Sequence, residues 1–423
     1  KELINMLNFK INSDKIDKIG NFTKEEKNFR LKNLDYFNDT GFPNKKSEDW
    51  KFSDLKAIVS ENFSKLDIQF SNSKKQKVDF IKDFEHNYII IVNGELTISD
   101  FKYEEKSKII LKSFSNDNYP NKKESNPLIN LNHALSNKGF FLEVKENYKF
   151  KKILVIYYLF TEDLDENILN SKNKIKIGKN SELHLLEYLV NNSKKNFFNN
   201  VHEDIILENS AILKNIYLQN NKSLGYFHKY SKNKLFTGSN YSYFIFPAGL
   251  KFNKLDLQFD LEGERSECNL QSASFLDNNE HQEIKTRVNH FSPNCKSHQK
   301  VKNVLNAESK GVYQGKIFVK DVAQKTDAYQ LSKAILLSER SEFDSKPELE
   351  IYADDVKCSH GSTSGNLDKD SIYYLMTRGL NQQESTKLLV NGFLNEIGDS
   401  IKSNSIRNFL KNKLEPLLLN EYK

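Results

Sequence analysis

The chain has 423 residues, a formal net charge of +6 and a hydrophobic fraction of 38%. Aromatic residues make up 12% of it, which is too many for a disordered chain, and its basic runs lie among acidic ones, which argues against nucleic-acid binding. Three cysteines without a CxxC pair favour a reducing compartment over a disulfide framework. No apolar run approaches the roughly 18 residues of a membrane span, and no secretory leader is visible.

Several enzyme signatures are also missing from the sequence. There is no GxxxxGK[ST] phosphate loop, so we do not expect the chain to hydrolyse ATP itself. Neither a GxGxxG fingerprint after a strand nor a GxSxG nucleophile elbow is present.

The first 60 residues are expected to be helical. Thr23-Lys-Glu-Glu26 fits a capping box, in which the Thr hydroxyl and the Glu carboxylate satisfy the first free amides of a helix. Gly41-Phe42-Pro43 should end that helix. The following stretch is polar and poorly patterned, and we interpret residues 61–85 as a linker.

Residues 86–367 have the pattern of a long β region. An Asn93-Gly94 turn signal separates the first two predicted strands. A short sequence motif, a polar turn that contains a serine, then recurs at 178–182, 208–211, 263–267 and 338–342. Units of two strands joined by a polar corner are typical of a solenoid, in which each turn buries its inward residues against the neighbouring turns. They are also typical of a β-sandwich. The pattern alone favours the sandwich. Strands are predicted at 88–92, 95–98, 140–144, 153–160, 175–177, 183–189, 205–207, 212–218 and onward to 317–318.

Near the end of this region the sequence places two metal-ligand types on one face. Val356, Cys358 and His360 share a parity, so in an extended chain the thiol and the imidazole project to the same side. This pair suits iron in a sulfide cluster, or zinc. Two ligands do not close a site. The residues alone therefore leave two possibilities: a structural role, which is the commoner one, or a site completed by another polypeptide.

Two further groups of candidate residues have simpler interpretations. His290, Cys295 and His298 have spacings that match no closed zinc pattern, so we interpret them as side chains of one structural rung. The carboxylates of Glu348, Glu350, Asp354 and Asp355 are interpreted as a solvated strand face and a corner rather than an acid–base pair.

The last segment, 368–423, is predicted to be helical. Asp368 can cap a first helix, and Asn381 with Glu384 can open a second one. A third helix is expected from about Ile406 up to Pro416. These helices are amphipathic and short, so they need a surface to lie against.

The segment from Gln324 to Leu380 resembles the SufB/SufD family of iron-sulfur cluster assembly proteins. The Lys-Cys-Ser-His-Gly signature at 357–361 is similar to its SufD branch. Trp50 in Glu-Asp-Trp-Lys-Phe-Ser-Asp-Leu, the Asn-His-Ala segment at 132–134, and the 311–318 stretch also look like family landmarks. The resemblance is dense in the last third of the chain and thin before residue 130.

The resemblance reverses the preference for a sandwich. It implies a mainly β fold, with a right-handed parallel β-helix core between helical N-terminal and C-terminal regions. It further implies a non-enzymatic scaffold in a complex with SufB and the ATPase SufC, in the bacterial cytosol or plastid stroma, with no nucleic-acid or membrane partner. Rival interpretations are a SufB-like scaffold and a β-helix enzyme acting on polysaccharide.

For the site, the resemblance implies that His360 helps to build a transient iron-sulfur cluster at the SufB interface. His360 would be a metal ligand shared with SufB, and Cys358 is assigned to the same cluster-assembly site. The helical tail would bind SufC, and we assign that contact to Tyr374, Arg378, Leu389 and Phe393. Whether the complex also holds a reduced flavin is left open.

Overall fold

The computed structural model describes residues 9–68, 76–115, 119, 122–219 and 222–419. The first residues of the predicted N-terminal region, the middle of the predicted linker and the last four residues of the tail lie outside this range.

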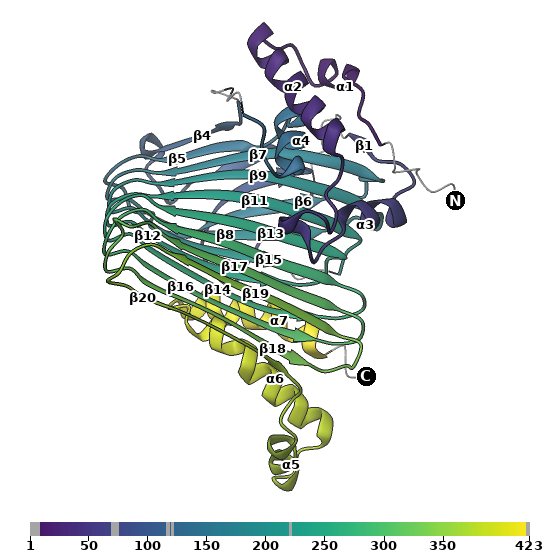
Figure 1. Ribbon diagram of the computed structural model, residues 1–423, viewed down its shortest axis with the longest axis vertical. Coiled ribbons are helices and arrows are strands. Elements are labelled where there is room, and N and C mark those ends of the chain that lie inside the picture. The colour runs from purple at the N-terminus through teal and green to yellow at the C-terminus, as the bar shows by residue number, and fades with distance from the viewer. Residues whose placement is uncertain (1–8, 69–75, 116–118, 120–121, 220–221, 420–423) are drawn as a thin grey trace.

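The core consists of two ten-stranded sheets that face each other (Figure 1). From β5 to β20 the chain alternates between the sheets, and each strand pairs in parallel with the strand two before or after it. This arrangement is a β-helix with two strands in each turn. Sheet A contains β1 (Asp67–Ile68), β4 (Ile109–Ser113), β5 (Phe140–Val144), β7 (Asn167–Ile177), β9 (Phe197–Leu207), β11 (Gly225–Leu235), β13 (Phe252–Leu261), β15 (His281–His290), β17 (Lys310–Val319) and β19 (Glu342–Ile351).

Sheet B has the same construction. Its first strands, β2 and β3, form an antiparallel hairpin at the end of the solenoid where β4 and β5 also pair antiparallel. Sheet B contains β2 (Asn87–Val92), β3 (Glu95–Asp100), β6 (Leu154–Phe160), β8 (Glu182–Asn191), β10 (Ile212–Gln219), β12 (Asn240–Pro247), β14 (Glu267–Leu276), β16 (Lys296–Leu305), β18 (Asp327–Leu336) and β20 (Lys357–Gly365).

The β-sandwich that the strand pattern alone favours is therefore wrong, and the β-helix implied by the family resemblance is confirmed. The recurring serine-containing motifs explain why the strand pattern did not distinguish a β-helix from a β-sandwich. Three of them form the same corner in different turns, before β8, β10 and β14, whereas 338–342 lies at the opposite edge, before β19. Asn180, Ser210 and Arg265 turn these three corners with φ values of 58°, 58° and 57°. Such corners would also join the strands of a sandwich, because local sequence does not specify which strands pair.

The space between the sheets is filled mainly by apolar side chains, with one charged cluster. Lys229 lies 2.7 Å from Glu187 and 3.0 Å from Glu203, and all three side chains are buried. Burial and the neighbouring charge of Glu187 outweigh the Lys229 charge and raise the pKa of Glu203 to about 7. Tyr243 and Ser231 donate hydrogen bonds to the two carboxylates. Both carboxylates are thus paired with Lys229 and accept a hydrogen bond, while the second oxygen of Glu203 has no partner among the described residues.

The N-terminal helices cover one end of sheet A (Figure 1). Thr23 caps α2 by accepting from the Glu26 amide at 3.2 Å, while the Glu26 carboxylate is 2.9 Å from Arg30. Gly41, with φ 69°, follows the last residue of α2, as predicted. The helical elements of this half are α1 (Asp14–Asp17), α2 (Lys24–Thr40), η2 (Glu48–Trp50), α3 (Leu55–Asn62), η3 (Lys106–Lys108) and α4 (Pro127–Leu135).

Trp50 anchors this region on the outer face of sheet A. Its ring is fully buried, and the Lys254 ammonium lies 4.5 Å from the ring centroid. Lys254 also forms an ion pair with Glu283 and donates to the Asp49 carbonyl at 2.8 Å. Ser53 donates to Glu283, so the landmark segment around Trp50 is held by buried polar contacts.

The C-terminal helices are α5 (Lys369–Thr377), α6 (Gln382–Asp399) and α7 (Asn404–Leu419). Asp368 caps α5, and Asn381 with Glu384 forms a capping box on α6. The end of α6 and α7 lie against sheet B, whereas α5 projects beyond the end of the solenoid (Figure 1). α7 extends to Leu419, so the predicted end at Pro416 lies three residues too early; this proline falls in the last turn of the helix. In the described part of the chain, no helix is long and apolar enough to cross a membrane.

Candidate functional site

The solenoid ends on two edge strands, β19 and β20 (Figure 1). In β20 the residues that face the space between the sheets are Cys358, His360, Ser362 and Ser364, because they continue the buried row Ala328, Gln330, Ser332 and Ala334 of β18. The predicted shared face of the thiol and imidazole therefore points into the open end of the β-helix.

Cys358 and His360 differ in their surroundings. Cys358 is half-buried and contacts a small apolar cluster that includes Ala328 and Val356. Burial raises the pKa of its thiol. His360 is exposed, because no further turn of the solenoid covers it, and it makes no hydrogen bond with any described residue. His360 is thus the more accessible of the two ligands.

Polar side chains lie directly behind His360. In the inward row, His360 follows Gln330 and Gln299. The Tyr313 hydroxyl joins these two glutamines, at 3.2 Å from Gln299 and 3.3 Å from Gln330. Gly315 leaves room for them, since a Cβ there would lie 2.1 Å from the Gln330 amide oxygen. The last turns of the core are therefore polar where the inner turns are largely apolar.

The described residues contain no group of three or more His, Cys, Asp and Glu side chains arranged to hold a metal ion. His290 is buried and hydrogen-bonded to Ser297 at 2.9 Å, Cys295 is buried at a corner 3.3 Å from the Ser266 hydroxyl, and the His298 side chain is 54% exposed. The interpretation of these three residues as part of a structural rung is confirmed for His290 and Cys295 by their burial. Cys295 directly precedes β16, and Ser266 directly precedes β14, the strand paired with it. The two residues therefore occupy the same corner position in neighbouring turns.

Comparison with known proteins decides the family. The family model described as "SUF system FeS cluster assembly, SufBD core domain" matches residues 159–393, and "SufBD protein N-terminal region" matches residues 9–156. The chain belongs to the SufBD family.

Its SufBD relatives include proteins of bacteria and plants. It is 25% identical over 377 residues to "Iron-sulfur cluster assembly protein SufD" of Escherichia coli, with 87% of each chain covered. It is 24% identical to a SufBD family protein of Synechocystis, with 87% of this chain and 86% of the relative covered. For the chloroplastic protein ABCI7 of Arabidopsis thaliana the identity is 23%, with 90% and 83% covered. The chain is thus a SufD-like member of an iron-sulfur cluster assembly family.

The four tail residues assigned to partner binding occupy different surroundings in this SufBD protein. Tyr374 is 56% exposed on α5, and the Arg378 guanidinium hydrogen-bonds its hydroxyl at 3.3 Å. Leu389 is half-buried on α6. Phe393 packs on sheet B, where the Lys302 ammonium lies 4.4 Å from its ring centroid. Two of the four residues therefore face solvent, and Phe393 holds α6 on the solenoid.

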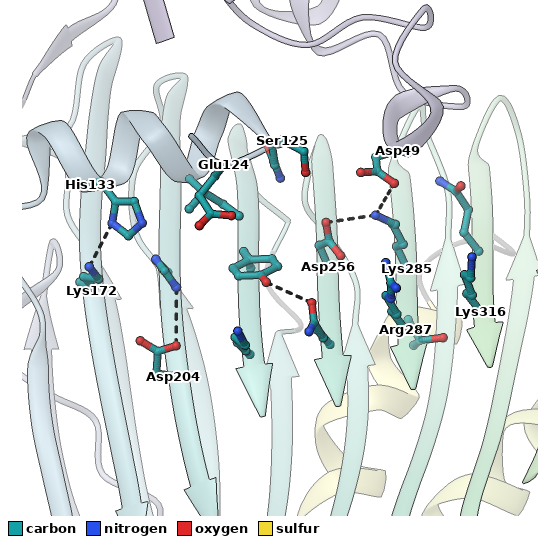
Figure 2. Close-up of a pocket in the computed structure, with 18 of the residues that line it drawn as sticks. Asp49, Glu124, Ser125, His133, Lys172, Asp204, Asp256, Lys285, Arg287 and Lys316 are labelled. Atoms are coloured by element: carbon teal, nitrogen blue, oxygen red, sulfur yellow. Dashed lines mark hydrogen bonds and ion pairs between the residues drawn. The ribbon is translucent and has the colours of Figure 1, made fainter. Parts of the chain in front are cut away.

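A polar groove on the outer face of sheet A was not predicted. It is a cavity of about 780 Å³ bounded by α4 and η2, and Figure 2 shows its charged lining. Its floor consists of two rows of side chains that run across β7, β9, β11, β13, β15, β17 and β19. The first row is Lys172, His202, Tyr230, Asp256, Lys285, Gln314 and Lys346; the second is Lys174, Asp204, Lys232, Gln258, Arg287, Lys316 and Glu348.

The sequence carries a signal for this groove that becomes readable only with the strand register. In the seven sheet A strands from β7 to β19, two polar residues stand two positions apart, as in Lys172 with Lys174 and His202 with Asp204. The interpretation of Glu348 and Glu350 as part of a strand face agrees with their ion pairs, to Lys346 at 2.6 Å and to Lys316 at 2.5 Å.

Proposed function

We propose that this SufBD family protein is a SufD-type scaffold subunit that docks SufB at the open end of its β-helix and SufC through its helical tail. The observation that carries the proposal is the open end itself, where the solenoid stops on two edge strands with Cys358 and His360 in its inward row.

An uncovered solenoid end is a binding surface. The outer edges of β19 and β20 present backbone donors and acceptors that pair with no described strand. The inward row of β19 brings Leu349 and Ile351 to the same end, and Ile351 is 37% exposed. A second β-helix that continues the two sheets would satisfy the backbone groups and cover these side chains together. SufB, as the partner implied by the family, is the proposed occupant.

The chemistry at this end favours assembly over permanent storage of a cluster. His360 offers an exposed imidazole, and the raised pKa of Cys358 keeps its thiol protonated until a cation approaches. We infer that SufB supplies the remaining ligands of the nascent iron-sulfur cluster, which is cargo of the complex. A cluster held by mixed ligands from two chains is released more easily than one held by four thiolates in one chain.

The tail is the proposed contact with SufC, in which the ATPase activity of the complex would reside. α5 contributes no buried residue and exposes Tyr373, Tyr374 and Met376. A cavity of about 660 Å³ separates α5 from the edge of the solenoid near Leu336. Exposed aromatic and sulfur-containing side chains are typical anchors of protein interfaces.

The proposal predicts which surface touches which partner. A photo-crosslinking amino acid at Thr363 on β20 should capture SufB when the three proteins are co-expressed, and the same amino acid at Tyr374 should capture SufC. Lys112, on β4 at the opposite end of the solenoid, is the matched control and should capture neither. Capture of SufB from Lys112, or its absence from Thr363, would contradict the proposed docking.

A further inference from the structure

We propose that the polar groove binds a small phosphorylated molecule, with Arg287 as the principal phosphate ligand between Lys232 and Lys316. This inference is independent of the proposed docking of SufB and SufC, because it concerns the outer face of sheet A and not the open end.

The charges of the groove floor are unbalanced. Its two rows contain seven lysine or arginine side chains and three carboxylates. The walls add Lys122 and three carboxylates, Glu48, Asp49 and Glu124, so the lining as a whole has eight basic and six acidic side chains. Lys285 is neutralised by Asp49 at 2.7 Å and Asp256 at 3.5 Å, as Figure 2 shows. By contrast, no described carboxylate lies within 4.0 Å of Lys174, Lys232 or Arg287, all of which belong to the second row.

Arg287 has the geometry of a phosphate ligand. It lies directly opposite Lys316 in the register of β15 and β17, whose backbones are about 4.8 Å apart. Lys316 is paired with Glu350, whereas the Arg287 Nε donates to Asn289 at 3.1 Å and its terminal nitrogens make no hydrogen bond with described residues. A guanidinium in this state can bind two phosphate oxygens at once.

The other end of the groove supplies hydrogen-bonding groups. His202 is 7% exposed, lies 3.7 Å from Asp204 through Nε2, and has no hydrogen-bond partner at Nδ1 among the described residues. Lys172 at the same end is 6% exposed, and its ammonium lies 3.0 Å from the His133 ring nitrogen Nδ1. Burial lowers the pKa of Lys172 to about 8. An unpaired buried polar atom is costly, and a ligand that reaches it would remove that cost.

The dimensions fit a small molecule. His202 on β9 and Arg287 on β15 are three strand spacings apart, which is about 14 Å. The volume of about 780 Å³ is within the roughly 300–1,000 Å³ of small-molecule sites. A phosphorylated compound with an uncharged, hydrogen-bonding body can therefore contact Arg287 and His202 simultaneously.

Isothermal titration of the full chain with inorganic pyrophosphate tests the phosphate end. We expect saturable binding by the natural chain, and at least tenfold weaker binding by Arg287→Gln and by Lys232→Gln. Both positions are solvent-accessible, and unchanged circular dichroism and thermal midpoints would verify that the variants are folded. The matched control is Lys234→Gln, two residues along β11, whose ammonium pairs with Glu262 at 3.1 Å outside the groove.

Three results would overturn the inference. These are the absence of saturable pyrophosphate binding, equal binding by Arg287→Gln and the natural chain, and an equal loss in Lys234→Gln, which would indicate attraction by net charge alone. A phosphate-binding groove instead requires affinity that depends on Arg287 and Lys232 and not on Lys234.

Discussion

His360 on β20 lies directly opposite Gln330 on β18, at the end of an inward row that Gln299 continues into the β-helix. Every residue before His360 in this row is buried by the next turn, and His360 is exposed only because the solenoid stops there. The same repeat that builds the core thus places an imidazole at the exposed end of the solenoid, which is the surface proposed above for the docking of SufB.

Trp50 should be the main attachment of the N-terminal region to the solenoid. Trp50→Ala removes a fully buried ring and its contact with the Lys254 ammonium. We expect a loss of about 3–5 kcal/mol in the free energy of unfolding in urea. Tyr373→Ala, at a position that is 70% exposed, should change it by less than about 0.5 kcal/mol. Equal effects of the two substitutions would contradict the anchoring role.

Removing the charge of Lys229 alone should destabilise the fold, whereas removing the charges of Lys229, Glu187 and Glu203 together should largely preserve its stability. Lys229→Met leaves Glu187 and Glu203 buried together and should cost about 3–5 kcal/mol of stability. Changing both carboxylates to glutamine in the same chain removes the stranded charges and should restore most of that loss. Urea unfolding of the single and triple variants measures both values, and failure of the triple variant to recover stability would contradict this account.

His290 should make stability depend on pH. Burial lowers its pKa to about 4 in the folded chain, against about 6.5 when unfolded. Its contribution is complete above pH 6.5 and is lost as the pH falls toward 4, because the unfolded chain then takes up a proton that the folded chain does not. The loss is about 1.4 kcal/mol per pH unit. His290→Gln should reduce this slope by about 1.4 kcal/mol per pH unit without abolishing it, because burial also lowers the pKa of His281 to about 4. His298→Gln, at an exposed position, is the matched control.

The tail variants should separate binding from folding. Tyr374→Ala and Arg378→Ala remove exposed groups, so we expect at least tenfold weaker SufC binding with the thermal midpoint unchanged. Phe393→Ala removes one of the apolar contacts between α6 and sheet B and should lower the thermal midpoint. Calorimetric titration with SufC and thermal unfolding of the same samples measure the two effects. Unchanged SufC affinity in both α5 variants would contradict the proposal that α5 contacts SufC.

Local features of the fold were predictable, whereas long-range pairing was not. The caps at Thr23, Asp368 and Asn381 depend on neighbouring residues only, and the sequence locates them correctly. The choice between sandwich and β-helix depends on which strands pair across about 29 residues, and only the family resemblance decided it. The shared face of Cys358 and His360 follows from strand parity, so it could be predicted.

The polar groove could not be predicted for the same reason. Arg287 and Lys316 are 29 residues apart in the chain and become neighbours only through the register of β15 and β17. Considered without the strand register, each residue is only a basic side chain on the outer face of a strand. Most lysines and arginines lie at the protein surface, so neither position indicates a binding site.

The most direct test of the central claim is the cluster content of the complex. This chain, natural or with His360→Ala, would be co-expressed anaerobically with SufB and SufC, and iron and sulfide would be measured per purified complex. Ser362→Ala, two residues along the same row, is the matched control. We predict that all three complexes form in equal yield and that only His360→Ala is depleted of iron and sulfide. Equal cluster content in His360→Ala and the natural complex would contradict a role for His360 in cluster assembly.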